Sequence, residues 1–170
     1  SKDDSLEVKI DTFSLVTNLR YDTVYYEIGW TDMGNHSNMD GYVSFLRSPV
    51  IDIHFDRFNV FLNNRFWSVD PSNLISIDST AIHLNKVDFG SGDQFARFNG
   101  RVSAADGDTL YASFNKLDIS TVDRLIGSSG LDFDGILSGN AKVTKPYENI
   151  SLITELKIDK FKFNRESLGD

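Results

Sequence analysis

Leu84, Asn85, Lys86, Val87, Asp88 and Phe89 form a phrase that returns as Phe114, Asn115, Lys116, Leu117, Asp118 and Ile119, thirty residues further along the chain. A second phrase, in which Asp or Asn is followed by Gly, any residue, an aliphatic residue and Ser, occurs at 40–44, 99–103 and 134–138. Repeats at intervals of about 20 to 50 residues are typical of arrays in which one structural unit stacks on the next. The unequal spacing of the second phrase indicates a degenerate array that tolerates insertions.

Apolar residues alternate with polar ones along most of the chain. Val24, Tyr26, Ile28 and Trp30, for example, stand at every second position. This period predicts antiparallel strands with one apolar face and one wet face. Strands are expected at 6–10, 24–30, 51–55 and 58–62, with a bend at 56–57 between the last two, and further strands at 75–77, 82–84, 95–102, 110–114, 136–143 and 152–158.

The connections between these runs support an all-β fold. Polar, glycine-containing turns are predicted at 90–93 and 105–108, and a longer loop at 32–40. One segment has a helical pattern instead, because Ser120 can cap it, Val122, Leu125 and Ile126 are apolar, and Gly127 can end it. The sequence therefore predicts an antiparallel, solenoid-like β-sheet with one short helix.

Composition narrows the classes of function. The chain has 170 residues, 40% of them hydrophobic, a net charge of −8 and no cysteine. The acidic balance disfavours nucleic acid and anionic membrane surfaces as partners, because no basic stretch exists to neutralise phosphates. The missing cysteines exclude disulfides and thiolate chemistry.

No constellation of catalytic residues stands out. None of His36, His54 and His83 has another His, Asp or Glu next to it in the sequence, and the acidic pair Asp132 and Asp134 fits an ordinary turn. The Gly-rich stretch 127–130 lacks the Lys and the helix of a phosphate loop. The residues predict a protein that is not an enzyme, with no catalytic residues, cofactor or metal site.

The stretch 66–170 resembles the middle of a protein of the TamB-like or AsmA-like family, the translocation and assembly module family, in the style of its Bacteroidetes members. The first third of the chain resembles it loosely. The residues that carry the resemblance are Trp67, Ile75, Ile77, the phrase 84–89, the stretch 98–103, the run from Asp108 through 114–120, Leu131 to Gly135 with Gly139, and the closing phrases 156–159 and 168–170.

The resemblance implies a segment of a long envelope protein of Gram-negative bacteria. Such proteins are anchored in the inner membrane by an N-terminal helix and extend through the periplasm. Their body is a curled β-sheet, compared to a taco, with an apolar groove that carries phospholipid acyl chains between membranes or helps outer-membrane protein assembly. On this hypothesis residues 1–170 are one internal, periplasmic segment of the sheet, without the anchor and without the part that meets an outer-membrane partner.

Many Phe and Leu residues occupy the apolar side of the predicted strands. In a closed sandwich they are core, whereas in a curled open sheet they line a groove. The groove hypothesis assigns lipid contact to Phe55, Leu62, Leu84, Phe98, Leu110, Phe114, Leu152 and Leu156.

An alternative is a β-sandwich that binds carbohydrate or another ligand, with Trp30, Trp67, Tyr25 and Tyr42 as stacking platforms. A lipid conduit keeps one apolar face along all strands, whereas a sugar binder gathers Trp and Tyr with Asp and Asn on the wet side. A segment cut from an array also exposes strand edges, so edge-to-edge self-association, or loops over the ends, is expected.

Overall fold

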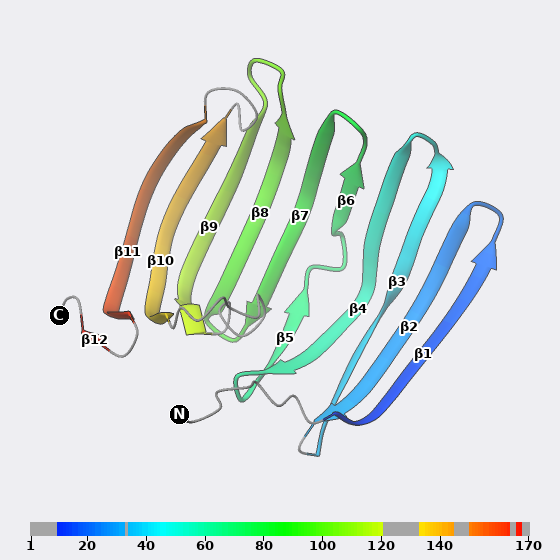
Figure 1. Cartoon of the computed structure of the whole chain (residues 1–170), viewed down its shortest axis with the longest axis horizontal. Coiled ribbons are helices and arrows are strands. Elements are labelled where there is room, and N and C mark those ends of the chain that lie inside the picture. Colours follow the sequence, from blue (N-terminus) through cyan, green and yellow to red (C-terminus); the bar gives the residue numbers. More distant parts are fainter. Residues whose placement is uncertain (1–9, 33, 121–132, 145–149, 164–165, 168–170) are drawn as a thin grey trace, which may run out of the picture.

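The computed structural model describes residues 10–32, 34–120, 133–144, 150–163 and 166–167. These residues form one twelve-stranded antiparallel sheet (Figure 1), which confirms the all-β prediction. The strands are β1 (Ile10–Arg20), β2 (Thr23–Asp32), β3 (Asn35–Arg47), β4 (Val50–Leu62), β5 (Arg65–Val69), β6 (Leu74–Ile77), β7 (Ala81–Ser91), β8 (Gln94–Ser103), β9 (Thr109–Asp118), β10 (Phe133–Thr144), β11 (Ser151–Phe163) and β12 (Glu166–Ser167).

The strand order follows the chain. Each strand pairs with its predecessor and successor, except that β5 and β6 share the place between β4 and β7. β5 pairs with one part of β4 through Trp67 and Val60, and β6 pairs with another part through Ile75 and Ile53 (Figure 1). Sequential antiparallel pairing is what short, turn-forming connections allow.

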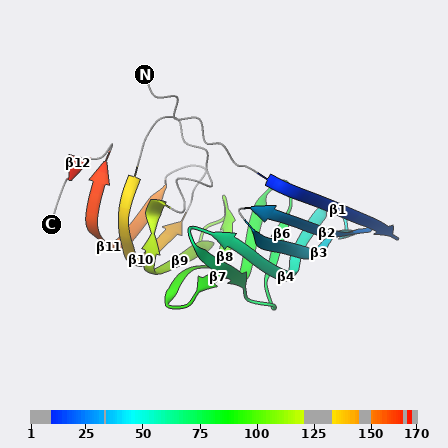
Figure 2. The ribbon, with the colours of Figure 1, turned by 90° about the horizontal axis from the view of Figure 1, so that it is seen from below.

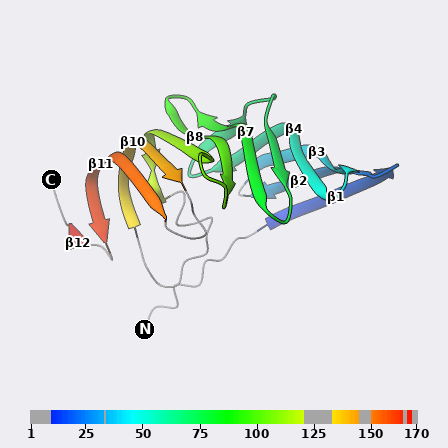
Figure 3. The ribbon, with the colours of Figure 1, turned by 90° about the horizontal axis from the view of Figure 1, so that it is seen from above.

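The sheet is curved along its length. Views from below and above show β1 and β11 raised on the same side of the middle strands (Figures 2 and 3). Irregular register accompanies this shape: Asp56 is an extra residue opposite 40–41, residues 85–86 oppose Asn99, residues 115–116 oppose Ser138, and residues 160–161 oppose Gly135. Such β-bulges bend a strand and increase its twist.

The repeated phrases occupy equivalent places in the sheet. Lys86 and Lys116 both have left-handed φ angles, 48° and 47°, at bulges of β7 and β9. The next residues, Val87 and Leu117, are both buried. The prediction that the two phrases hold equivalent positions in one sheet is thus confirmed, and Lys160 on β11, with φ 56°, adds a third bulge lysine.

Residues of the second phrase lie opposite all four bulges, at 40–41, Asn99, Gly135 and Ser138. A Cβ on Gly41 would lie 2.0 Å from the carbonyl oxygen of His54, and one on Gly100 would lie 2.1 Å from that of Thr109. Only glycine allows so close an approach of the neighbouring backbone. Side chains opposite the bulges bind the freed N–H groups, since Lys86 N donates to Asn99 Oδ1 at 3.3 Å and Lys116 N to Ser138 Oγ at 2.9 Å.

Four sequence predictions differ from the described structure or lie largely outside it. The prediction of a long loop at 32–40 is wrong, because β3 begins at Asn35. The polar residue Ser37 of β3 is buried, and its hydroxyl oxygen accepts a hydrogen bond from the N–H of Phe61 at 2.9 Å. The bend predicted at 56–57 is a bulge inside the continuous strand β4. The strand predicted at 6–10 and the helix at 122–126 lie outside the described residues, apart from Ile10 in β1. Ser120 is already helical and donates to Asp118 Oδ1, so Asp118 takes the capping place predicted for Ser120.

Candidate functional site

One face of the sheet is apolar from β1 to β11, and we call it the apolar face. Directly opposed residues of an antiparallel sheet point to the same side. In one row across five strands, Leu84 opposes Gly100, Gly100 opposes Leu110, Leu110 opposes Val143 and Val143 opposes Leu152. The register therefore places the apolar side chains of the separate strands on one common face of the sheet.

The same rows continue toward the N-terminal strands. Leu84 opposes Ile75, which opposes Ile53, and the row runs on through Val43 and Val24 to Leu19 of β1. Alternation and register place all eight predicted groove residues on this face: Phe55, Leu62, Leu84, Phe98, Leu110, Phe114, Leu152 and Leu156. Their role in contacting lipid stays a prediction.

Aromatic rings join neighbouring strands on the apolar face. Tyr26 meets Phe55 edge to face, with ring centroids 6.5 Å apart, and Phe98 meets Phe114 at 5.9 Å. Phe58 of β4 and Phe89 of β7 approach to 5.4 Å, although β5 lies between their strands. Side chains two strands apart meet in this way when the sheet bends toward the face that bears them. The apolar face is therefore concave at this point.

The described residues provide no second layer over the apolar face. All described strands belong to the one sheet, and each packs on its sheet neighbours. Only Trp67, Ala81, Val87, Ala112 and Leu117 are buried apolar residues among those described. Toward the edges exposure is large, at 70% for Leu19 and 60% for Leu152. The described structure is thus a single curved sheet and not the closed sandwich of the alternative hypothesis.

Tyr26 places a polar hydroxyl group on the apolar face, where it is hydrogen-bonded to the backbone. Its hydroxyl reaches over Gly41 and donates to the carbonyl oxygen of His54 at 3.2 Å. Burial, followed by the charges of Asp56 and Asp40, raises the pKa of Tyr26 to about 12. The neutral phenol is favoured because a buried charge loses its hydration.

The opposite face is polar and bears cross-strand ion pairs. Arg57 Nε lies 2.5 Å from Asp40 Oδ1, and Arg97 Nε lies 3.4 Å from Asp88 Oδ2. These pairs are half exposed, so each adds little stability. They make this face largely hydrophilic, although the exposed side chains of Val16, Phe66 and Ile153 also lie on it, and the continuous apolar surface is on the other face.

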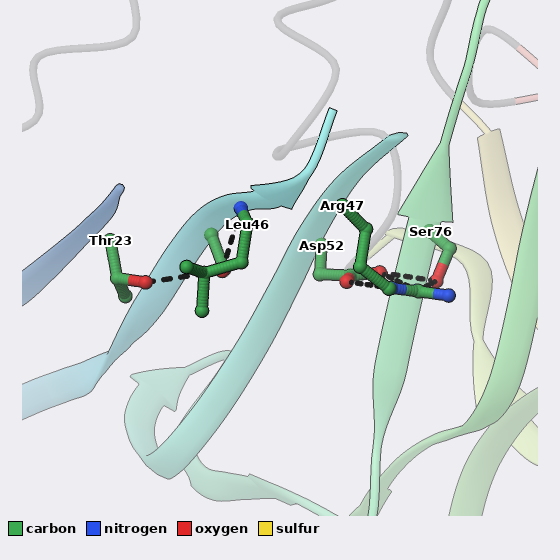
Figure 4. A network of polar contacts seen from close by, with 6 residues as sticks. Thr23, Leu46, Arg47, Asp52 and Ser76 are labelled. Carbon is green, nitrogen blue, oxygen red and sulfur yellow. Dashed lines mark hydrogen bonds and ion pairs between the residues drawn. The ribbon is translucent and has the colours of Figure 1, made fainter. Parts of the chain in front are cut away.

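A buried polar row crosses β2, β3, β4 and β6 on the polar face (Figure 4). Thr23 donates to Ser44 Oγ at 3.1 Å, and Ser76 donates to Asp52 Oδ1 at 2.6 Å. Arg47 Nε donates to Asp52 Oδ2 at 2.8 Å, and this hydrogen bond lowers the pKa of Asp52. These cross-strand hydrogen bonds fix the register of the four strands.

The four aromatic residues predicted to stack on a sugar do not lie together on one surface. Trp67 is 6% exposed, and Trp30 lies on the apolar face, whereas Tyr25 and Tyr42 oppose each other on the polar face with ring centroids 6.1 Å apart. Four aromatic rings split between two faces cannot stack on one saccharide.

A small polar cavity of about 290 Å³ lies where the β4–β5 turn meets the ends of β8 and β9. It is lined by Asn63, Asn64, Arg65, Trp67, Gln94 and Asp118. Asn63 Nδ2 donates to Asp118 Oδ2 at 2.9 Å, which ties the hairpin turn to a strand three places along the sheet. The cavity is therefore next to the Asn63–Asp118 hydrogen bond, which connects the β4–β5 turn to the end of β9.

The histidines lie apart. His54 Nδ1 contacts the Asn73 carbonyl and its Nε2 lies 3.3 Å from Asp56, while His36 Nδ1 lies 3.4 Å from Thr31 Oγ1. In the part of the chain that the structure describes, no three His, Cys, Asp or Glu side chains gather as metal ligands. That part also contains no helix of the length and hydrophobicity needed to cross a bilayer.

No family model, curated protein or solved structure matches this chain.

One part of the apolar face was not predicted from the sequence. Phe13, Leu15 and Leu19 of β1 extend it to the sheet edge, opposite Trp30, Ile28 and Val24. The alternation of Phe13, Ser14 and Leu15 was the available signal, but the strand was expected earlier, at 6–10.

Proposed function

We propose that this chain is a non-enzymatic segment of a TamB-like or AsmA-like envelope protein, and that its apolar face holds phospholipid acyl chains. On this proposal the segment lies in the periplasm, and its parent moves phospholipid between membranes or helps outer-membrane protein assembly. The observation that supports it best is the register, which joins the apolar sides of β1 to β11 into one face.

The chemistry of the face suits an acyl chain. A hydrocarbon chain needs a long surface without charges, and each buried methylene contributes about 0.8 kcal/mol. The face offers aliphatic side chains interleaved with aromatic rings, such as the Phe98 and Phe114 pair. Its curvature toward the rings of Phe58 and Phe89 gives a chain neighbours on more than one side.

A direct test compares two variants on one strand. Phe114 and Tyr111 both lie on β9, but Phe114 is on the apolar face and the half-exposed Tyr111 is on the polar face. Phe114→Glu puts a carboxylate on the acyl path and should abolish binding of a fluorescent fatty-acid probe, because the charge must be desolvated. Tyr111→Glu should bind as the unaltered chain does.

Lipid extraction and mass spectrometry of the purified chain should recover phospholipid from the unaltered protein and from Tyr111→Glu, but not from Phe114→Glu. Circular dichroism must show the same β spectrum for all three. Equal probe binding by both variants would refute the proposal, and unfolding of Phe114→Glu would show that the residue is closed core. Leu156→Glu with Lys157→Glu as its control repeats the comparison on β11.

A further inference from the structure

The outer edge of β1 has no partner among the described strands. β1 stands at the end of the strand order, and β2 is its only described neighbour. From Thr12 to Leu19 the strand contains no charged residue and no proline. Natural sheets protect long edges with charges, proline or bulges, since an unprotected edge pairs with other strands.

The other long edge strand, β11, differs. Glu155 and Lys157 project from its polar face, and Lys160 introduces a bulge. β12 also pairs with its end through Lys162 and Phe163. These are protective features of an edge. In β1 the register irregularity, at 10–12, and the charges of Asp11 and Arg20 lie only at the two ends, so the two edges are chemically unequal.

Apolar side chains of β1 are exposed on both faces. Leu19 is 70% exposed on the apolar face, and Val16 is 60% exposed on the polar face. A ligand on the apolar face alone leaves Val16 in water, whereas a strand paired with the edge covers both sides of β1.

The ends of β1 select the direction of pairing. Asp11 stands at one end and Arg20 at the other. Antiparallel pairing of two copies brings the acidic end of each beside the basic end of the other. Parallel pairing aligns like charges, which is unfavourable. We propose that β1 pairs antiparallel with β1 of a second copy, about a two-fold axis at Val16, so that two sheets become one.

The register follows from the faces. A two-fold axis perpendicular to the sheet keeps both faces continuous. With the axis at Val16, Phe13 faces Leu19 of the other copy and Ser14 faces Asn18. With the axis at Leu15, Asp11 would face Leu19, which sets an acid against an apolar side chain. This association concerns the chain 1–170 by itself, since a preceding strand of a longer parent would occupy the same edge of β1, and it is independent of what the apolar face binds.

A cysteine cross-link tests the axis directly. The chain contains no cysteine, so Val16→Cys introduces a single thiol. Opposed residues of antiparallel strands have Cα atoms about 4.5 to 5.5 Å apart, within the range of a disulfide. Mild oxidation of the Val16→Cys chain should give a covalent dimer. Ile153→Cys, on the polar face of β11 and also 60% exposed, should stay uncross-linked.

Light scattering supplies the second measurement. Val16→Lys places like charges against each other at the axis and should weaken the dimer about tenfold or more. Ile153→Lys should leave the dimer intact. A monomeric unaltered chain overturns the proposal, and so does a dimer that Ile153→Lys breaks and Val16→Lys does not. Circular dichroism separates loss of the dimer from loss of folding.

Discussion

The N-terminal block of the sheet, β1 to β4, and the C-terminal block, β7 to β11, use the same Gly phrase in different backbones. Gly41 in β3 lacks a left-handed φ angle, whereas Gly100 in β8 has φ 124°. The bulge opposite Gly41 contains Asp56 with an ordinary φ angle, whereas the bulge opposite Asn99 contains Lys86 at φ 48°. Both glycines face a carbonyl oxygen that a Cβ would strike. Close strand approach is thus the shared requirement, and positive φ angles at the phrase glycine and at the bulge occur in the C-terminal block alone among the positions compared.

The blocks also differ in how they fix register. The N-terminal block uses the buried polar row that contains Ser44 and Asp52. The C-terminal block uses side chains that bind bulge N–H groups, such as Ser138 on Lys116. Since a register slip would turn apolar side chains to the wet face, each device protects the continuity of the apolar face.

Gly100→Ala should have the largest effect. The new Cβ meets both the Thr109 carbonyl and a φ angle unfavourable for alanine, so we expect a loss of about 3 kcal/mol or more, or failure to fold. Gly107→Ala is the control, since Gly107 has φ 95° with no atom near its Cβ position, and should cost about 1 kcal/mol. Urea unfolding followed by circular dichroism measures both. Equal losses would contradict the role of strand approach.

Asp52→Asn should have the next effect, about 1 to 2 kcal/mol at neutral pH, because the buried Asp52 carboxylate loses a charge-assisted hydrogen bond to Arg47, whose side chain is 58% exposed. The Arg47 hydrogen bond lowers the pKa of Asp52 in the folded state. Its stabilising contribution is therefore present above the ordinary value of 3.8 and is lost as the pH falls through the folded value.

The control for Asp52 is Asp93 of the C-terminal block. The pKa of Asp93 is also lowered, by its hydrogen bond with Lys116, but both side chains are exposed. Asp93→Asn should leave stability nearly unchanged, since water and salt screen such a pair. Unfolding curves of both variants at neutral and acidic pH test this. A difference between Asp52→Asn and the unaltered chain that persisted at acid pH would argue against the linkage.

The smallest expected effect comes from Lys86→Gly. A left-handed lysine is strained by about 1 to 2 kcal/mol, whereas glycine adopts this backbone freely at a cost in chain entropy, so a gain of up to about 1 kcal/mol is expected. Asp56→Gly, compared with Asp56→Asn, should instead lose about 0.5 to 1 kcal/mol, because its φ angle needs no relief. Thermal unfolding of the three variants measures these changes in stability. A loss of stability in Lys86→Gly would show that the two bulges do not differ in backbone strain.

The sequence by itself determined the strand content, most of the strands and the repeat. Period-two alternation is local, so Leu110, Ala112 and Phe114 could be placed on one side of their strand without coordinates. The repeated phrases also marked equivalent positions, because a left-handed bulge lysine is a local backbone requirement.

Other features depended on tertiary structure. Polar residues 35–38 looked like a loop, but Ser37 is buried in a strand because Phe61, distant in sequence, supplies its hydrogen-bond partner. Alternation also could not choose between a closed sandwich and one curved sheet. That choice depends on which strands pair and whether a second layer covers them, and both are long-range properties that no single strand encodes.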